Sequence, residues 1–142
     1  MKTTKKIVTL LLLVLILVSC NKDDDSSSEF INVVSVSYDF TNGINNCSNP
    51  NGTGSVLFFK INYEVSEGIE IMKVLTHIEL SGGESEDFED LTFGDNGNQI
   101  ERADCFRFGS NTWVDYRIRL ESVDGIVSNS KTVRVDKPAG AL

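Results

Sequence analysis

The residues best suited to chemistry are the single histidine, His77, and the five acids of segment 84–90 (ESEDFED). A serine or cysteine nucleophile needs a neighbouring base and a group that orients that base, and no nucleophile motif surrounds any serine here. Paired carboxylates could support glycoside hydrolysis, but we expect these acids to form a solvated loop that protects an edge strand. We therefore predict no catalytic residues, and a chain that is not an enzyme.

Metal ligands are equally sparse in the sequence. One histidine excludes a multi-histidine centre, and His77 shares the expected wet face of its strand with Lys73 and Glu79. Segments 84–90 and 94–98 (GDNGN) offer oxygen atoms to calcium, which needs six to eight of them, but neither matches a known calcium loop. We expect no metal and no cofactor, with calcium at the acidic loops as the alternative.

Trp113, the only tryptophan, has the same parity as Arg117 and Arg119 in an alternating segment. Exposed aromatic residues and arginines are frequent in binding surfaces. The alternative is a cross-strand cation–π ladder that covers its own face. The three residues form a possible binding face for a protein or a glycan.

The elements that must position these residues are strands, because apolar and polar residues alternate with a period of two after Phe30. In the first of them, Val34, Val36, Tyr38 and Phe40 share one face. Turn residues separate seven expected strands, at 31–40, 55–66, 69–80, 88–93, 98–108, 112–123 and 126–136. This spacing predicts an all-β fold, a seven-stranded antiparallel β-sandwich.

The segment 113–135 (WVDYRIRLESVDGIVSNSKTVRV) resembles the final hairpin of a fibronectin type III or related immunoglobulin-like domain. The residues that match are Tyr116, Ile118 and Leu120 on one face, the turn Asp124-Gly125, and then Ser128, Val133 and Val135. The resemblance implies an immunoglobulin-like β-sandwich over residues 30–142. The chain departs from the family in its long first loop and in lacking a tryptophan in the second strand. Because this family hosts many unrelated functions, the resemblance implies architecture alone.

The N-terminus has the layout of a signal peptide, with Lys2, Lys5 and Lys6 before the segment 7–18, which is apolar except for Thr9. The alternative, an uncleaved membrane anchor, needs about 20 apolar residues. The motif LVSC at 17–20 resembles the lipobox of bacterial lipoproteins. That resemblance implies cleavage after residue 19, a diacylglycerol on the sulfur of Cys20 and an acyl chain such as palmitate on its nitrogen.

The segment that follows, NKDDD at 21–25, resembles the lipoprotein export signal of the Bacteroidota. The resemblance implies that Lys22, Asp23, Asp24 and Asp25 direct the protein to the outer face of the outer membrane. The plainer interpretation is a solvated, disordered tether over residues 20–29. The domain organisation is then a signal peptide at 1–19, the lipidated tether at 20–29 and the sandwich at 30–142.

The net charge indicates which partners the protein can bind, and the cysteine content indicates in which compartment it folds. Without the three lysines of the signal peptide, 10 basic residues face 21 acidic ones, a net charge of −11 that disfavours nucleic acid. Export permits a disulfide between the two remaining cysteines, Cys47 and Cys105, with two buried thiols as the alternative. The type III resemblance makes the second and fifth strands antiparallel neighbours, which brings the loop of Cys47 beside Cys105.

The sequence thus predicts a surface-exposed outer-membrane lipoprotein that acts as a non-enzymatic binding or structural module for a protein or a glycan. A periplasm-facing accessory subunit of an envelope complex is the alternative. A small hydrolase that uses the acidic loop is a third possibility.

Overall fold

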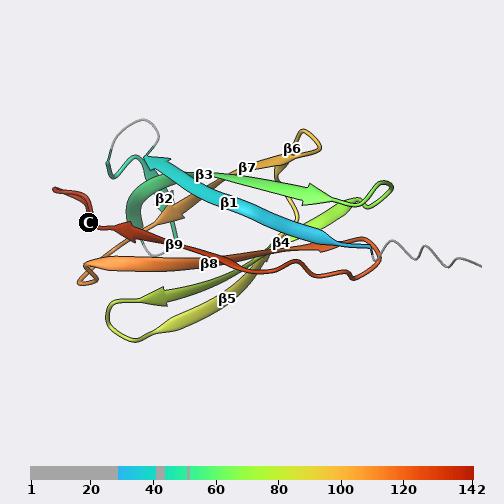
Figure 1. The fold of residues 1–142 in the computed structure, drawn as a ribbon. Helices are drawn as coiled ribbons and strands as arrows, with labels where there is room; N and C mark the ends of the chain where they lie inside the picture. The colour runs from blue at the N-terminus through green and yellow to red at the C-terminus, as the bar shows by residue number, and fades with distance from the viewer. Residues whose placement is uncertain (1–28, 41–43, 51) are drawn as a thin grey trace, which may run out of the picture.

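The computed structural model describes residues 29–40, 44–50 and 52–142, which fold into two antiparallel β-sheets packed face to face (Figure 1). The all-β prediction is confirmed. The described residues form nine strands: β1 (Ile31–Phe40), β2 (Cys47–Asn49), β3 (Gly52–Val65), β4 (Ile71–Leu80), β5 (Ser85–Asp90), β6 (Gly94–Asp95), β7 (Gln99–Phe106), β8 (Trp113–Ser122) and β9 (Lys131–Asp136).

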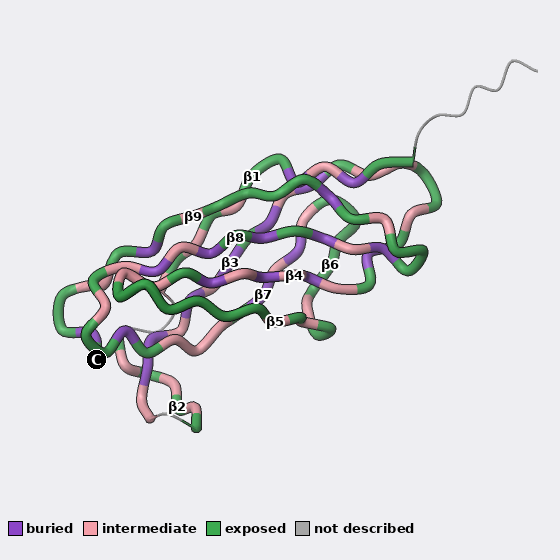
Figure 2. Tube along the Cα trace, turned by 90° about the horizontal axis from the view of Figure 1, so that it is seen from below, coloured by how far each residue is buried: buried purple, intermediate pink, exposed green. Residues whose placement is uncertain are grey.

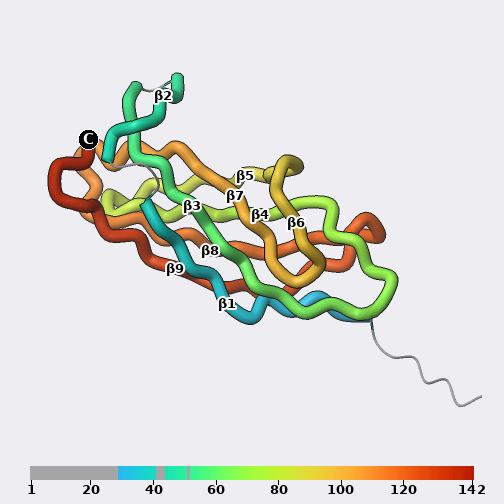
Figure 3. The backbone as a smooth tube through the Cα atoms, turned by 90° about the horizontal axis from the view of Figure 1, so that it is seen from above, coloured from blue at the N-terminus to red at the C-terminus, as the bar shows by residue number. Residues whose placement is uncertain are grey.

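The first sheet has the strand order β1-β3-β7-β6, and the short strand β2 pairs with the start of β3. The second sheet has the order β5-β4-β8-β9. Figure 3 shows the first sheet crossing above the second, with β1 on the side of β9 and β7 on the side of β5. The second and fifth long strands, β3 and β7, are antiparallel neighbours as expected, with Val56 opposite Cys105.

The core lies between the sheets, because alternate residues of each strand point inward. In β8 the buried set is Val114, Tyr116, Ile118 and Leu120, and the facing strand β3 contributes Leu57, Phe59 and Ile61. Figure 2 shows this alternation of buried and exposed residues along the strands. Full burial of such a side chain stabilises the fold by about 1.5–3 kcal/mol.

One inward position was predicted wrongly. Val34 is 46 % exposed, whereas Val33 is fully buried. The pairing of β1 with β3 shifts register between Val33 and Ser35, which marks a β-bulge. An extra residue in one strand reverses the facing of the residues beside it, so Ile31 and Val33 point inward before the bulge and Val36 and Tyr38 pack on the core after it.

The described residues form nine strands rather than the predicted seven, because the short strands β2 and β6 were not expected, and the boundaries of the predicted strands differ by up to five residues. β5 begins at Ser85, because a tight turn, in which Leu80 N donates to Glu84 O at 2.8 Å, pairs β5 with the end of β4. The last strand begins at Lys131 rather than at residue 126. Before it, Asn129 turns to β1: Val33 N donates to Asn129 Oδ1 at 2.7 Å, and Asn129 Nδ2 donates to Val33 O at 3.1 Å.

The predicted disulfide between Cys47 and Cys105 is present, with Cα atoms 5.9 Å apart. It joins β2 to β7 across the start of β3. At Gly54 the backbone of β3 approaches the backbone of β7 closely. A side chain does not fit there, because a Cβ at position 54 would lie 2.5 Å from the carbonyl oxygen of Phe106. The bridge therefore fixes the β2–β3 hairpin against the end of β7.

The beginning of β1 lies at one end of the sandwich and the C-terminus at the other (Figures 1 and 2). The disulfide lies near the C-terminal end, where Phe108 N donates to Leu142 O at 2.8 Å. The described part of the chain contains no helix of the length and hydropathy needed to cross a membrane.

Candidate functional site

The solvent-facing side of the second sheet, called here the outer face, carries the predicted binding residues. Trp113, Arg117 and Arg119 alternate along β8 with the buried residues of the core, as their parity predicted. Arg117 lies opposite His77 of β4 on one side and opposite Thr132 of β9 on the other. The outer face therefore combines side chains from all four strands of this sheet.

Two of the cations on the outer face are paired with carboxylates. Lys73 Nζ lies 3.1 Å from Glu89 Oε2 and 3.3 Å from Glu121 Oε1, and the hydrogen bond to Glu89 raises the pKa of Lys73. Arg134 donates from Nε and Nη2 to the two carboxylate oxygens of Asp115, at 2.8 and 2.7 Å. These bonds lower the pKa of the Asp115 carboxyl, and the charge of Arg117 lowers it further.

Trp113 is covered by one of these paired cations. The guanidinium carbon of Arg134 lies 3.9 Å from the centre of the indole ring. The stacked cation is thus a residue of β9, not Arg117 or Arg119 of its own strand. This is the cross-strand cation–π arrangement that the sequence offered as the alternative, and it leaves less of the indole ring open to a ligand.

Arg117 and Arg119 belong to neither pair, although the charge of Arg117 acts on Asp115. Both are exposed, and neither forms an ion pair or a hydrogen bond with another described residue. They border a hollow of about 290 Å³ together with His77, Asp87 and Ser130, and we call these five residues the arginine hollow. His77 Nδ1 lies 2.9 Å from Asp87 Oδ1, so the imidazole N–H donates to the carboxylate.

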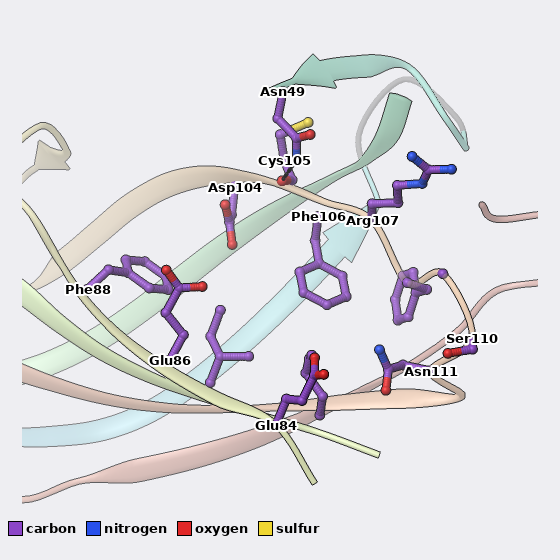
Figure 4. Close-up of a pocket in the computed structure, with 14 residues that line it drawn as sticks. Asn49, Glu84, Glu86, Phe88, Asp104, Cys105, Phe106, Arg107, Ser110 and Asn111 are labelled. Atoms are coloured by element: carbon purple, nitrogen blue, oxygen red, sulfur yellow. Dashed lines mark hydrogen bonds between the residues drawn. The ribbon is translucent and has the colours of Figure 1, made fainter. Parts of the chain in front are cut away.

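A second hollow, called here the edge pocket, lies between the edge strand β5 and the end of β7, beyond the part of β7 that pairs with β6, and has a volume of about 520 Å³ (Figure 4). Three acids line it, Glu84, Glu86 and Asp104, so part of the acidic segment borders a cleft that the sequence did not imply. In Figure 4, Asp104 and the ring of Phe106 project from β7 into this space. Asp104 Oδ2 accepts a hydrogen bond from the hydroxyl of Tyr116 at 3.0 Å.

The edge pocket does not have the composition of a serine-nucleophile site. Its lining contains neither histidine nor lysine to act as a base beside Ser110. Among the described residues, no group of three or more His, Cys, Asp or Glu side chains is arranged to hold a metal ion. The pocket is a gap with a mixed polar and apolar lining at the edge of the sandwich, next to the disulfide.

The sequence interpretation missed a buried arginine. Arg102 of β7 is 4 % exposed and points into the core, where its guanidinium carbon lies 5.6 Å from the ring centre of Phe59 and 5.1 Å from that of Phe88. The strand alternation contained the signal, since Arg102 has the inward parity of Ile100 and Phe106. The sequence contained no comparable indication of the residues that join the two arginines at the arginine hollow. These residues, His77, Asp87 and Ser130, come together only through the pairing between strands.

The predicted lipidation residue Cys20 and the predicted export residues Lys22, Asp23, Asp24 and Asp25 lie outside the described residues. No protein-family model matches the chain, and comparison with curated proteins and with solved structures finds no match either.

Proposed function

We propose that this protein is an outer-membrane lipoprotein, exposed at the cell surface, whose β-sandwich binds a protein or a glycan and catalyses no reaction. The observation that carries this proposal is the pair of exposed, unpaired guanidinium groups at the arginine hollow. Arginine is frequent in the energetically dominant part of binding surfaces because its planar fork makes several directed hydrogen bonds. An acidic chain that only needed solubility would not require two unpaired cations side by side.

The membrane anchor in this proposal is Cys20. The lipobox at 17–20, placed directly after the apolar segment, supports lipidation there. A single acyl chain holds a protein at a membrane only marginally, and stable anchoring needs a second chain. A diacylglycerol on the sulfur and a palmitate on the nitrogen meet that requirement.

The surface location rests on residues 22–25 and agrees with the shape of the domain. The tether joins the sandwich at the beginning of β1, which lies at the end opposite the C-terminus (Figure 1). The disulfide-linked end would then point away from the membrane. The outer face would stand along the side of the domain, where a ligand outside the cell can reach it.

The finer fold assignment is a fibronectin type III-like or immunoglobulin-like domain. The two sheet orders, β1-β3-β7 and β5-β4-β8-β9, support it, because a type III-like sandwich places its first, second and fifth strands in one sheet. Such a scaffold agrees with a binding module but does not by itself identify a ligand.

The test uses cells that express the full chain, incubated with panels of labelled proteins and labelled glycans. We expect wild-type cells to bind at least one ligand that cells with Arg117→Glu/Arg119→Glu do not bind. The matched control, Lys60→Glu/Lys131→Glu, makes the same change in charge at two exposed lysines outside the arginine hollow and should bind as the wild type does. Equal binding by the wild type and the arginine variant, or binding by neither, contradicts the proposal.

A further inference from the structure

We infer that the arginine hollow binds a sugar unit that carries a carboxylate or a sulfate, within an acidic glycan. This inference rests on the proposed binding function and names the class of its ligand. The hollow is lined by His77, Asp87, Arg117, Arg119 and Ser130 and lies on the outer face, between β5 and the chain that leads into β9.

The two arginines provide the anion site. Positions 117 and 119 are two apart in one strand, so their side chains leave the same face about 6.4–6.8 Å apart along it. Long, flexible arginine side chains at that spacing can converge on one anionic group. Guanidinium groups bind carboxylates and sulfates through paired N–H donors, in shorter and stronger hydrogen bonds than neutral donors form.

The rest of the lining matches hydroxyl groups. Asp87 uses Oδ1 toward His77, which leaves its other carboxylate oxygen as an acceptor for ligand hydroxyls. The hydroxyl of Ser130 is exposed and can donate or accept. Among the described residues, no aliphatic side chain and no Phe, Tyr or Trp lines the hollow, whereas protein–protein sites centre on buried apolar and aromatic anchors. An anion that also carries hydroxyls therefore fits this lining better than an acidic protein segment does.

Neighbouring carboxylates favour a glycan whose anionic groups lie far apart along the chain. Arg119 also borders another hollow, which contains Glu89 and Glu121. Lys73 offsets only one of these two negative charges. The remaining charge and that of Asp87 in the arginine hollow would repel a closely following anionic group. The net charge of −11 on the chain without its signal peptide is screened beyond about 8 Å at physiological ionic strength. Attraction at the hollow therefore depends on the two arginines and weakens as salt is added.

The experiment uses the full chain, solubilised in detergent, and measures its binding to four immobilised polymers. Alginate offers carboxylates on sugar rings, dextran sulfate offers sulfates on sugar rings, dextran offers neutral sugars, and poly-L-glutamate offers carboxylates without sugars. We expect alginate or dextran sulfate to bind at least about tenfold more tightly than dextran and poly-L-glutamate. The tighter of these two ligands shows whether the hollow prefers carboxylate or sulfate.

The variant Arg117→Gln/Arg119→Gln should weaken binding of the preferred glycan at least about tenfold, and the matched variant Lys60→Gln/Lys131→Gln should stay within about twofold of the wild type. Unchanged thermal unfolding of both variants shows that these exposed substitutions leave the fold intact. Full binding by the arginine variant, or equal binding of poly-L-glutamate, overturns the inference. If none of the four polymers binds the wild type while the cell panels identify a protein ligand, the inference fails and the proposed function survives.

Discussion

Arg102 of β7 donates a hydrogen bond from Nη1 to Oγ1 of Thr76 on β4, at 2.8 Å, and so joins the two sheets inside the core. The nearest carboxylate, that of Asp90, lies 3.9 Å from Nε of Arg102, which has no hydrogen-bond partner among the described residues. A buried cation with incomplete pairing loses much of its hydration without full compensation. Packing alone would favour an apolar residue at this position.

The pair can be tested with a double-mutant cycle. Thr76→Val leaves Nη1 of Arg102 buried without its acceptor, so it should lower the free energy of unfolding by about 1–3 kcal/mol. In the background of Arg102→Met, which keeps a long side chain between the two phenyl rings, the same change should cost less than about 0.5 kcal/mol. Urea unfolding of the four proteins gives the coupling energy.

Thr132→Val on β9 is a suitable control, because Thr132 is exposed and should tolerate the change within about 0.5 kcal/mol. If Thr76→Val costs the same with Arg102 and with Met at position 102, the hydrogen bond contributes nothing and Thr76 acts only through packing. Arg102→Met alone should be neutral or stabilising, as with other buried charges replaced by apolar residues of similar size.

A second prediction concerns alkaline pH. Burial raises the pKa of the Tyr116 hydroxyl well above 10, with the nearby Asp104 as a further cause. A raised pKa in the folded state favours the neutral phenol, so this stabilisation is complete below pH 10, the value for the unfolded chain, and falls as pH rises above it. Near pH 7, Tyr116→Phe should lower the unfolding free energy by about 0.5–1.5 kcal/mol through loss of the hydrogen bond to Asp104.

Above pH 10 the wild type should lose stability faster than Tyr116→Phe, so the difference between them should shrink. Chemical denaturation at a series of pH values from 7 to about 11 measures it. Tyr38→Phe is the control, since the hydroxyl of Tyr38 has no hydrogen bond to another described residue and its ring is only partly buried. A constant difference between the wild type and Tyr116→Phe across this range would rule out the proposed linkage.

The third prediction concerns the disulfide. The bridge closes a loop with a sequence separation of 58, and the chain-entropy relation assigns about 4 kcal/mol to such a cross-link. Cys47→Ser/Cys105→Ser should lower the unfolding free energy by an amount of this order. A reductant should bring the wild type to the same unfolding midpoint and leave the variant unchanged. Two free, alkylatable thiols in the exported protein, detected by mass spectrometry, would contradict the bridge.

The positions of the long strands β1, β3, β4, β7, β8 and β9 could be predicted from the sequence because each has one largely apolar face. In β8 the alternation of Tyr116, Ile118 and Leu120 with Asp115, Arg117 and Arg119 leaves one way to bury the apolar set. The disulfide between Cys47 and Cys105 could also be predicted. The resemblance supplied the strand order, and only these two cysteines remained once Cys20 was assigned to lipidation.

The features that the sequence did not predict depend on the register between neighbouring strands and on bulges that change this register. The bulge after Val33 turns Val34 outward. The apolar positions of β1 change from odd to even numbers at the pair Val33-Val34, but the alternation does not show which of the two valines faces the core. The stacking of Arg134 on Trp113 and the meeting of His77 with Arg117 require knowledge of which residues stand opposite each other. The arginine hollow therefore becomes visible only in three dimensions, although both of its arginines were candidates in the sequence.

The last prediction concerns export. Asp23, Asp24 and Asp25 lie three to five residues after Cys20, the proposed lipidation residue, within the segment that resembles the export signal. Replacing all three with alanine should leave the protein lipidated at Cys20 and in the membrane, but protected from protease added to intact cells. Acyl labelling and membrane fractionation report lipidation, and loss of the full-length band after protease treatment reports exposure.

The matched control replaces Ser26, Ser27 and Ser28 with alanine, which changes the same tether at three positions without altering its charge. This variant should be digested as the wild type is. Cys20→Ser should instead abolish acyl labelling and leave an uncleaved or soluble protein. If the triple aspartate variant is digested as readily as the serine control, the acids only extend the tether, since the lipid alone would then be sufficient to bring the domain to the surface.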